Sequence, residues 1–215
     1  EIIGYDKAGV FYGIQTLRAL LPVHYKNQRQ REIILPHSML SIKDAPRFRY
    51  RGMHADVARS FRTPDEMKRF LDLMATYKLN VLHFHLTDDE GWRLEIPGLP
   101  ELTKVGAFRD HQGIKTIPLV PSLGSGPMMD TSKSGNGYYS KAQFIELLRY
   151  ARERHIKVIP ELDFPGHARA AIKAMNYRYE KYLDDGDQDA ARRFLLEHPA
   201  DSSQYESVQK WRDNV

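Results

Sequence analysis

Apolar residues recur along this chain at helical spacing in four segments. The first is residues 6–21, and the second begins at 63–66, where Thr-Pro-Asp-Glu combines an N-cap residue, a proline in the first turn and a glutamate that completes a capping box. Ser140 and Gln143 repeat the capping box before a third helical segment. Residues 168–182 follow the same period. The pattern therefore predicts four amphipathic helices.

Runs of β-prone residues alternate with these helices. Residues 48–57, 79–86 and 156–162 predict three strands, each ending in charged residues, and 33–35 predict a further short strand. From the first long run onwards the order is strand, helix, strand, helix, strand, which is typical of a parallel sheet with right-handed crossovers. We therefore expect an α/β fold. Residues 106–137 are rich in Gly, Pro and Ser and predict a long loop, a feature that is usually functional or disordered.

A turn signal at Asp44-Ala45-Pro46 divides the chain. One helix and one short strand precede it, which is less than a whole domain. We therefore expect residues 1–43 to be the C-terminal part of a small α/β domain with its linker, and residues 44–215 to belong to a second domain. The first residues carry neither an initiator methionine nor the regions of a signal peptide, so we expect a piece of a longer protein.

Composition narrows the classes of function. The chain has 215 residues, of which 41% are hydrophobic, and no apolar run approaches the roughly 18 to 20 residues of a membrane span. The 32 Lys and Arg are scattered and barely outnumber the 28 Asp and Glu, so a nucleic-acid partner is disfavoured despite a pI near 9.1. The absence of cysteine excludes a disulfide framework and a thiolate metal site, and leaves the compartment undecided.

Charged side chains follow each of the three predicted strands. They are Asp56 and Arg59, then Asp88, Asp89 and Glu90, then Glu161, Asp163 and His167. The carboxyl ends of neighbouring parallel strands meet at one rim, where such a cluster binds a polar substrate and tunes the pKa values of its members. Any single acid here is equally explained as a helix cap or a solvated loop residue. Recurrence at three successive strand ends favours a site.

His83 and His85 project from the same side of the second strand because side chains alternate along a strand. One interpretation is a metal pair of the kind that barrel hydrolases carry, with Asp88 or His167 as further ligands. The other is that one or both are hydrogen-bonded core histidines. The second is favoured because a metal site of that type recruits ligands from later strands, and we predict no metal.

Three aromatic residues lie near the predicted rim in sequence. Trp92, Tyr138 and Tyr139 are suited to form a platform for a sugar ring, or to pack beneath the long loop. The sequence leaves both interpretations open.

Four motifs, in order, resemble those of the family 20 glycoside hydrolases, the β-N-acetylhexosaminidases, and above all bacterial chitobiases. They are GVFYGIQTL (9–17), YRGMHADVARSF (50–61), HFHLTDDEGWR (83–93) and VIPELDFPGH (158–167). The resemblance covers nearly the whole chain. It implies the last helix of a small α/β domain followed by the first three βα units of a TIM (β/α)8 barrel. Such a barrel takes about 250 residues, so the resemblance implies a partial barrel.

The resemblance also implies an activity. Family members are retaining, exo-acting hydrolases that remove terminal N-acetylglucosamine or N-acetylgalactosamine, with the substrate's own 2-acetamido oxygen as nucleophile. By position, Arg59 resembles the arginine that grips the terminal sugar's hydroxyls, a task suited to its fork of donors. Asp88 and His167 resemble the catalytic pair that hydrogen-bonds the general-acid glutamate and adjusts its pKa. Asp163 resembles a further acid of the same supporting network, and we count it with Arg59 among the substrate-binding residues.

The same resemblance implies the partners and the location. We expect N-acetylglucosamine-terminated oligosaccharides or glycoconjugates as substrates, no cofactor, and a periplasmic or secreted protein. Two alternatives remain from the residues alone. One is a metal-dependent amidohydrolase-like barrel that uses His83 and His85, and the other is a non-catalytic carbohydrate-binding protein.

The chain departs from the family in one respect. The family's catalytic Asp-Glu pair follows the fourth strand, and no fourth strand is predicted before Val215. The Asp-Glu pairs at 65–66 and 89–90 do not fit the family's position. We therefore expect the general acid to be missing from these residues.

The isolated 215-residue chain is expected not to hydrolyse 4-nitrophenyl N-acetyl-β-glucosaminide, because the family's Asp-Glu pair, which supplies the general acid, is expected to be missing from it. The measurement is release of nitrophenol by the purified chain. Turnover above the buffer rate contradicts the prediction. Stoichiometric zinc in the same preparation favours the amidohydrolase alternative.

Overall fold

The computed structural model describes residues 1–21, 40–109, 119, 121–126 and 134–197. The chain divides into two compact units. The division falls within each of the three predicted strands, so both units contain part of every one of these strands. The first unit comprises Glu1–His54, Asp65–His83 and Glu146–Ile159, and the second comprises Ala55–Pro64, Phe84–Ile145 and Pro160–Val215. The domain boundary expected at Asp44 stays a prediction.

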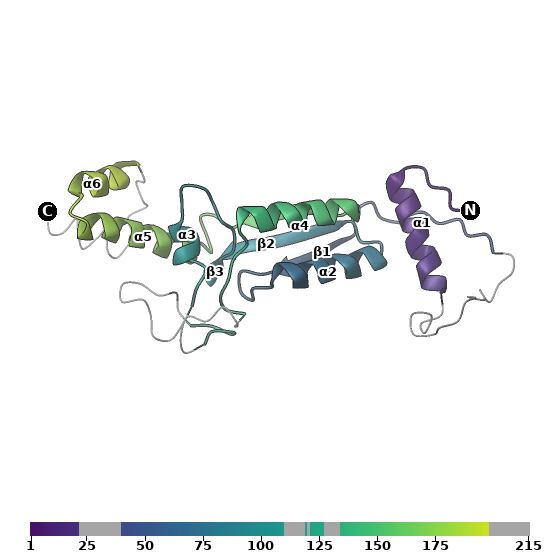
Figure 1. The fold of residues 1–215 in the computed structure, drawn as a ribbon, viewed down its shortest axis with the longest axis horizontal. Coiled ribbons are helices and arrows are strands. Elements are labelled where there is room, and N and C mark those ends of the chain that lie inside the picture. The colour runs from purple at the N-terminus through teal and green to yellow at the C-terminus, as the bar shows by residue number, and fades with distance from the viewer. Residues whose placement is uncertain (22–39, 110–118, 120, 127–133, 198–215) are drawn as a thin grey trace. The chain divides into compact units, whose positions relative to one another are not determined.

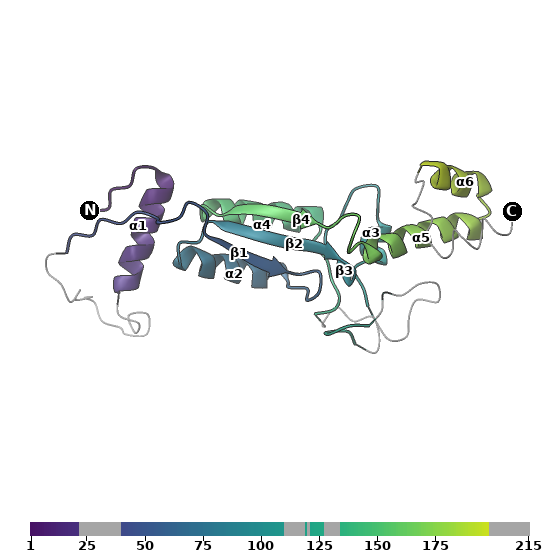
Figure 2. The ribbon, with the colours of Figure 1, turned by 180° about the vertical axis from the view of Figure 1, so that it is seen from behind.

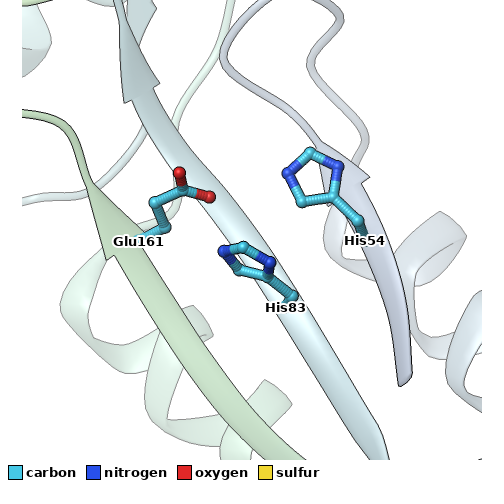
Figure 3. A group of neighbouring side chains, drawn as sticks. All are labelled: His54, His83 and Glu161. Atoms are coloured by element: carbon cyan, nitrogen blue, oxygen red, sulfur yellow. The ribbon is translucent and has the colours of Figure 1, made fainter. Parts of the chain in front are cut away.

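The sheet is built around one long strand. This strand, β2 (Val81–Asp88), pairs with β1 (Gly52–Asp56), β4 (Lys157–Leu162) and the short β3 (Gly91–Trp92). The arrows of β1, β2 and β4 run in the same direction (Figure 3). This arrangement confirms the three predicted strands and their parallel order.

Helices α2 (Pro64–Thr76) and α4 (Lys141–Glu153) cover one face of the sheet in the first unit. Figure 1 shows both helices in front of the strands, and Figure 2, from behind, shows the strands in front of both helices. Their apolar stripes are buried, as the helical spacing predicts. The buried residues are Met67, Leu71, Met74 and Ala75 of α2, and Leu147 and Ala151 of α4.

The remaining helices agree with the sequence pattern only in part. The predicted N-terminal helix is α1 (Lys7–Leu20), and the predicted fourth helix is α5 (Arg169–Asp184). Two short helices were not indicated by the pattern, α3 (Glu101–Lys104) and α6 (Gln188–Glu197). The strand predicted at 33–35 lies outside the described residues. No helix in the described part of the chain has the length and apolarity needed to cross a membrane.

The capping box that begins α4 forms as the sequence predicts. The Gln143 main-chain N–H donates to Ser140 Oγ at 3.2 Å, and the Ser140 main-chain N–H donates to Gln143 Oε1 at 2.9 Å. These reciprocal bonds satisfy main-chain donors that the first turn leaves without helical partners. The start of α4 is therefore set by local sequence.

Strand β2 extends two residues beyond its predicted end at Leu86. It includes Asp88, because the chain turns back at once and pairs Asp88 with Gly91 in an antiparallel hairpin. A Cβ atom at Gly91 would lie 2.5 Å from Arg93 Cζ and 2.7 Å from the Ala58 carbonyl oxygen, so only glycine fits. Asp88 is consequently held on a strand and not in a loop.

Arg93 follows this hairpin and is completely buried. Its guanidinium donates all five of its N–H groups to main-chain carbonyl oxygens. The acceptors are Val57 at 3.0 Å, Ala58 at 2.7 Å, Ala107 at 2.8 Å, Gly135 at 3.0 Å and Gly137 at 3.0 Å.

The bonds of Arg93 join segments that are far apart in sequence. They tie the chain immediately before Arg59 to both ends of the predicted loop 106–137. Burial, with the nearby Arg109 charge, lowers the pKa of Arg93 to about 9, which leaves the guanidinium charged at neutral pH. Arg109 adds a second link, because its Nη2 donates to the Arg59 carbonyl oxygen at 2.8 Å.

Arg93→Lys is expected to lower the free energy of unfolding by about 3 kcal/mol or more, since an ammonium has three donors and leaves at least two buried carbonyl oxygens without a partner. Urea unfolding measures the loss. The control is Arg154→Lys, at an arginine that pairs with the half-exposed Asp72, for which we expect about 1 kcal/mol or less. Equal losses in the two variants would exclude the special role of Arg93.

Candidate active site

Charged side chains from the strand ends meet in the second unit around Arg59. Its Nη1 lies 2.9 Å from Asp56 Oδ2, its Nη2 lies 2.7 Å from Asp88 Oδ2, and its Nε lies 3.1 Å from Glu90 Oε2. The Arg59 main-chain N–H also donates to Asp56 Oδ1 at 3.0 Å. The Arg59 side chain is nevertheless 41% exposed. It is therefore held in place by three carboxylates and still accessible.

Asp88 is the buried centre of this network, with a side chain only 1% exposed. Its Oδ2 accepts from Arg59 and from His85 Nε2, the latter at 2.9 Å. Its Oδ1 accepts from the Asp89 main-chain N–H at 2.6 Å and from His167 Nδ1 at 3.2 Å. Each carboxylate oxygen thus has two donors, and the carboxylate has one stable orientation.

These partners also determine the charge of Asp88. Burial alone raises the pKa of the carboxyl group, but the bonds from Asp89 N–H and His85 and the charges of Arg59 and His167 outweigh it. The net effect lowers the pKa of Asp88 below its usual value. Asp88 is therefore ionised at neutral pH.

His85 lies between two carboxylates. Its Nε2 faces Asp88, and its Nδ1 lies 3.0 Å from Glu161 Oε2. Burial disfavours the imidazolium, but the bonds to Glu161 and Asp88 prevail and raise the pKa of His85. The sequence interpretation of a hydrogen-bonded buried histidine is confirmed. Its partners are site residues, which the alternation along the strand did not indicate.

His83, two residues earlier on the same strand, has different surroundings. Its ring centroid lies 4.7 Å from that of His54 on β1, edge to face. Figure 3 shows these two rings and the side chain of Glu161 on β4. Among the described residues, no group of potential metal ligands contains both His83 and His85. The two histidines therefore do not form the metal pair that was considered from the sequence.

Two other groups in the second unit have the donor types of a metal site. They are His85 with Glu161 and Asp163, and Asp88 with Asp89 and His167. In both, ring nitrogens and carboxylates already bond to one another. A cation would have to displace these bonds, so the geometry favours a charge network over a metal centre.

His167 is more than half exposed, and its Nδ1 faces Asp88 Oδ1. Because the ionised carboxylate accepts from Nδ1, the lone pair of neutral His167 lies on Nε2, on the opposite side of the ring. The positive φ of 54° at this residue is an uncommon backbone conformation outside glycine. The buried carboxylate of Asp88 thus sets both the orientation and the tautomer of the His167 ring.

Asp163 is linked to the site through its backbone. Its main-chain N–H donates to Thr87 Oγ1 at 3.1 Å. The structure thus places Asp88 in direct contact with both Arg59 and His167, and Asp163 at the neighbouring strand end. Their roles in binding and catalysis stay predictions.

Two of the three aromatic residues near the rim, Tyr139 and Trp92, pack within the protein. Tyr139 is fully buried, and its hydroxyl donates to the Arg62 carbonyl oxygen. The Trp92 ring N–H donates to the Leu94 carbonyl oxygen at 2.6 Å, and the indole packs against a core cluster. A buried Tyr139 cannot stack on a sugar, so the platform interpretation is wrong for this residue.

Comparison with protein families decides the class of the chain. Residues 48–213 match the model described as "Glycosyl hydrolase family 20, catalytic domain". The chain belongs to glycosyl hydrolase family 20. The resemblance seen in the four sequence motifs is confirmed.

Curated relatives agree with this assignment. A β-hexosaminidase of Vibrio vulnificus is 48% identical over 215 residues, which is 100% of this chain and 24% of that protein. An N,N′-diacetylchitobiase of Vibrio harveyi is 50% identical over 208 residues, which is 97% of this chain and 22% of that protein. The chain therefore spans about a quarter of the length of the curated relatives it matches.

Solved structures of the family share the fold. A family 20 exo-β-N-acetylglucosaminidase from Vibrio harveyi, in complex with N-acetylglucosamine, has a TM-score of 0.61 at 37% identity and covers 79% of this chain and 24% of its own. A mutant Streptomyces plicatus β-hexosaminidase, in complex with its product N-acetylglucosamine, has a TM-score of 0.61 at 39% identity, with 77% and 29% covered. The predicted fold, part of a TIM barrel, is thereby confirmed.

Asp88→Asn is expected to lower the free energy of unfolding at pH 7 by about 3 kcal/mol, because removing the buried carboxylate leaves its cationic partners uncompensated. The pKa of folded Asp88 lies below that of the unfolded chain. Its contribution is therefore complete above the unfolded value of about 3.9 and is lost as the pH falls through the folded value.

Urea unfolding of both proteins at pH 7 and near pH 3 measures this dependence. The gap between wild type and Asp88→Asn should narrow at the lower pH. The matched control is Asp72→Asn, at a half-exposed carboxylate paired with Arg154, for which we expect about 1 kcal/mol or less. A gap of equal size at both pH values contradicts the role of the ionised Asp88.

Proposed function

We propose that this chain is part of a β-N-acetylhexosaminidase of the chitobiase type. The enzyme releases terminal N-acetylglucosamine or N-acetylgalactosamine by substrate-assisted retaining hydrolysis. The observation that carries the proposal is that Asp88 contacts both Arg59 and His167, three residues that the family motifs mark as functional. The names of the Vibrio relatives, β-hexosaminidase and N,N′-diacetylchitobiase, support the same substrate class.

The surroundings of Arg59 are suited to an uncharged polyol. A guanidinium has five N–H donors. The three carboxylate contacts of Arg59 do not use all of these N–H groups, so donors remain available to a ligand. Asp56 and Glu90, each about one-third exposed, offer acceptor oxygens beside it. Adjacent donors and acceptors can bind a vicinal diol, in which each hydroxyl both donates and accepts. Arg59 is therefore the proposed grip on the terminal sugar.

The contact between Asp88 and His167 supports the second half of the proposal. Asp88 fixes His167 with Nδ1 toward the buried carboxylate, so Nε2 remains to bond a carboxylic acid. An oriented imidazole next to a general acid adjusts the acid's pKa and restores its proton after transfer. In this proposal the described residues bind the sugar and support the acid, and the family's Asp-Glu pair after the fourth strand supplies the acid itself.

We also propose a periplasmic or secreted location. Its support is the family resemblance, since the proposed substrates are extracellular oligosaccharides and glycoconjugates. Cell fractionation followed by immunoblotting with an antibody to this chain tests the location, and signal confined to the cytoplasmic fraction contradicts it.

A chimera tests the activity. The aligned segment of the Vibrio vulnificus β-hexosaminidase is replaced by this chain, which matches it over 215 residues. We expect the chimera to hydrolyse 4-nitrophenyl N-acetyl-β-glucosaminide. Arg59→Ala should lower kcat/KM by about 100-fold, because charged hydrogen bonds to the sugar are lost. His167→Ala should lower kcat by about 100-fold with little change in KM, because the general acid loses its support.

The control is Arg154→Ala in the same chimera, because Arg154 pairs with Asp72 on the helices and lies outside the proposed site. It should stay within about twofold of the parent chimera, as expected for a surface pair. A folded chimera without activity, or equal losses in Arg59→Ala and Arg154→Ala, would refute the assignment.

A further inference from the structure

Two side chains that the proposed function does not use, His85 and Glu161, are linked to its central acid, Asp88. Glu161 Oε2 lies 3.0 Å from His85 Nδ1, and His85 Nε2 lies 2.9 Å from Asp88 Oδ2. Asp88 Oδ1 then lies 3.2 Å from His167 Nδ1. Carboxylate and imidazole groups thus alternate in a continuous line of four residues. The line begins on β4, crosses β2 and ends at the exposed imidazole before α5.

We propose that His85 and Glu161 are positioning residues for His167, and that His85, clamped between Glu161 and Asp88, fixes the Asp88 carboxylate so that its other oxygen, Oδ1, orients the His167 ring. The role of His167 rests on the proposed function. The clamp itself rests on the contacts of the described residues.

The two carboxylates favour a protonated His85. A neutral imidazole has one N–H donor and one lone pair. Its lone pair would face one of the two carboxylate oxygens, with the side-chain donor Arg59 Nη1 3.2 Å from Nε2. The protonated ring presents an N–H group toward each carboxylate. His85 is only 4% exposed, so water has little access to the ring.

The charges around His85 favour the same state. Four carboxylates and one guanidinium face the ring, so the surroundings are net negative before the imidazole is counted. They are Asp88 on its own strand, Asp56 and Arg59 at the end of β1, and Glu161 and Asp163 at the end of β4. Arg59 Nη1 lies 3.2 Å from His85 Nε2, and Asp88 Oδ2 is the shared acceptor between the two cations.

This arrangement has a consequence for substrate binding. Asp88 Oδ2 has two side-chain donors, and only Arg59 is exposed enough to move toward a sugar. His85 is buried and is not exposed enough to move toward a sugar. It keeps the Asp88 carboxylate in place whatever bonds Arg59 makes. The clamp is therefore expected to affect His167 and not the sugar grip.

The test is NMR of the imidazole nitrogens in the full 215-residue chain, which gives the titration of His85 and the tautomer of His167. In the wild type, the pKa of His85 should lie above the usual value of about 6.5. Glu161→Gln, which keeps the shape and removes one charge, should lower the pKa of His85. His85→Gln releases the Asp88 carboxylate and should change His167 from the single Nδ1–H tautomer to a mixture of both tautomers.

The control is His155→Gln, the same substitution at a histidine whose ring contacts Phe11. It should leave the tautomer of His167 unchanged. A wild-type His85 that titrates at or below 6.5, or the same His167 tautomer in His85→Gln and His155→Gln, overturns the inference. If His85→Gln does not fold, Glu161→Gln decides alone, and an unchanged pKa of His85 in that variant overturns the inference.

The inference and the proposed function fail in different experiments. The NMR titrations need no hydrolysis, so an inactive chimera refutes the proposed function without altering them. An active chimera together with unchanged titrations refutes the clamp alone.

Discussion

Arg93 donates five hydrogen bonds from a fully buried guanidinium, and the geometry of the site depends on it. A buried cation is stable only when every donor has a partner, so the surrounding carbonyl oxygens have little freedom. Two of these carbonyls belong to Val57 and Ala58, immediately before Arg59. Packing of the Arg93 side chain also explains why Gly91 can carry no side chain and why the β2–β3 hairpin is so tight.

Strand β2 carries both buried apolar residues and residues of the site. Leu82, Phe84 and Leu86 are buried apolar residues on one face of the strand. His85 projects from the other face, beside the network around Asp88. One strand thus anchors the helices and presents the charged groups. Because the apolar face fixes the register of the strand, it also fixes the position of the histidine.

Local patterns were sufficient for most of the elements. The helix starts at Pro64 and at Ser140 depend on neighbouring residues, as the reciprocal bonds of Ser140 and Gln143 show. The extension of β2 to Asp88 was not predictable in this way, because it depends on pairing with Gly91 and on the space that Arg93 fills. The short helices α3 and α6 were also missed. α3 has only four residues, which are too few to show a period.

The sequence by itself determined the α/β order, the family through its four motifs, and the strand ends where charged residues gather. Only the tertiary structure decided which of these residues touch. In the structure, Asp88 contacts Arg59 and His167, and Asp163 is linked to the site through its main-chain N–H. Tyr139 is a buried core residue. The structure also revealed His85 between two carboxylates, which alternation cannot show. The physical reason is that period and capping act within one element, whereas ion pairs and burial depend on neighbours brought together by the sheet.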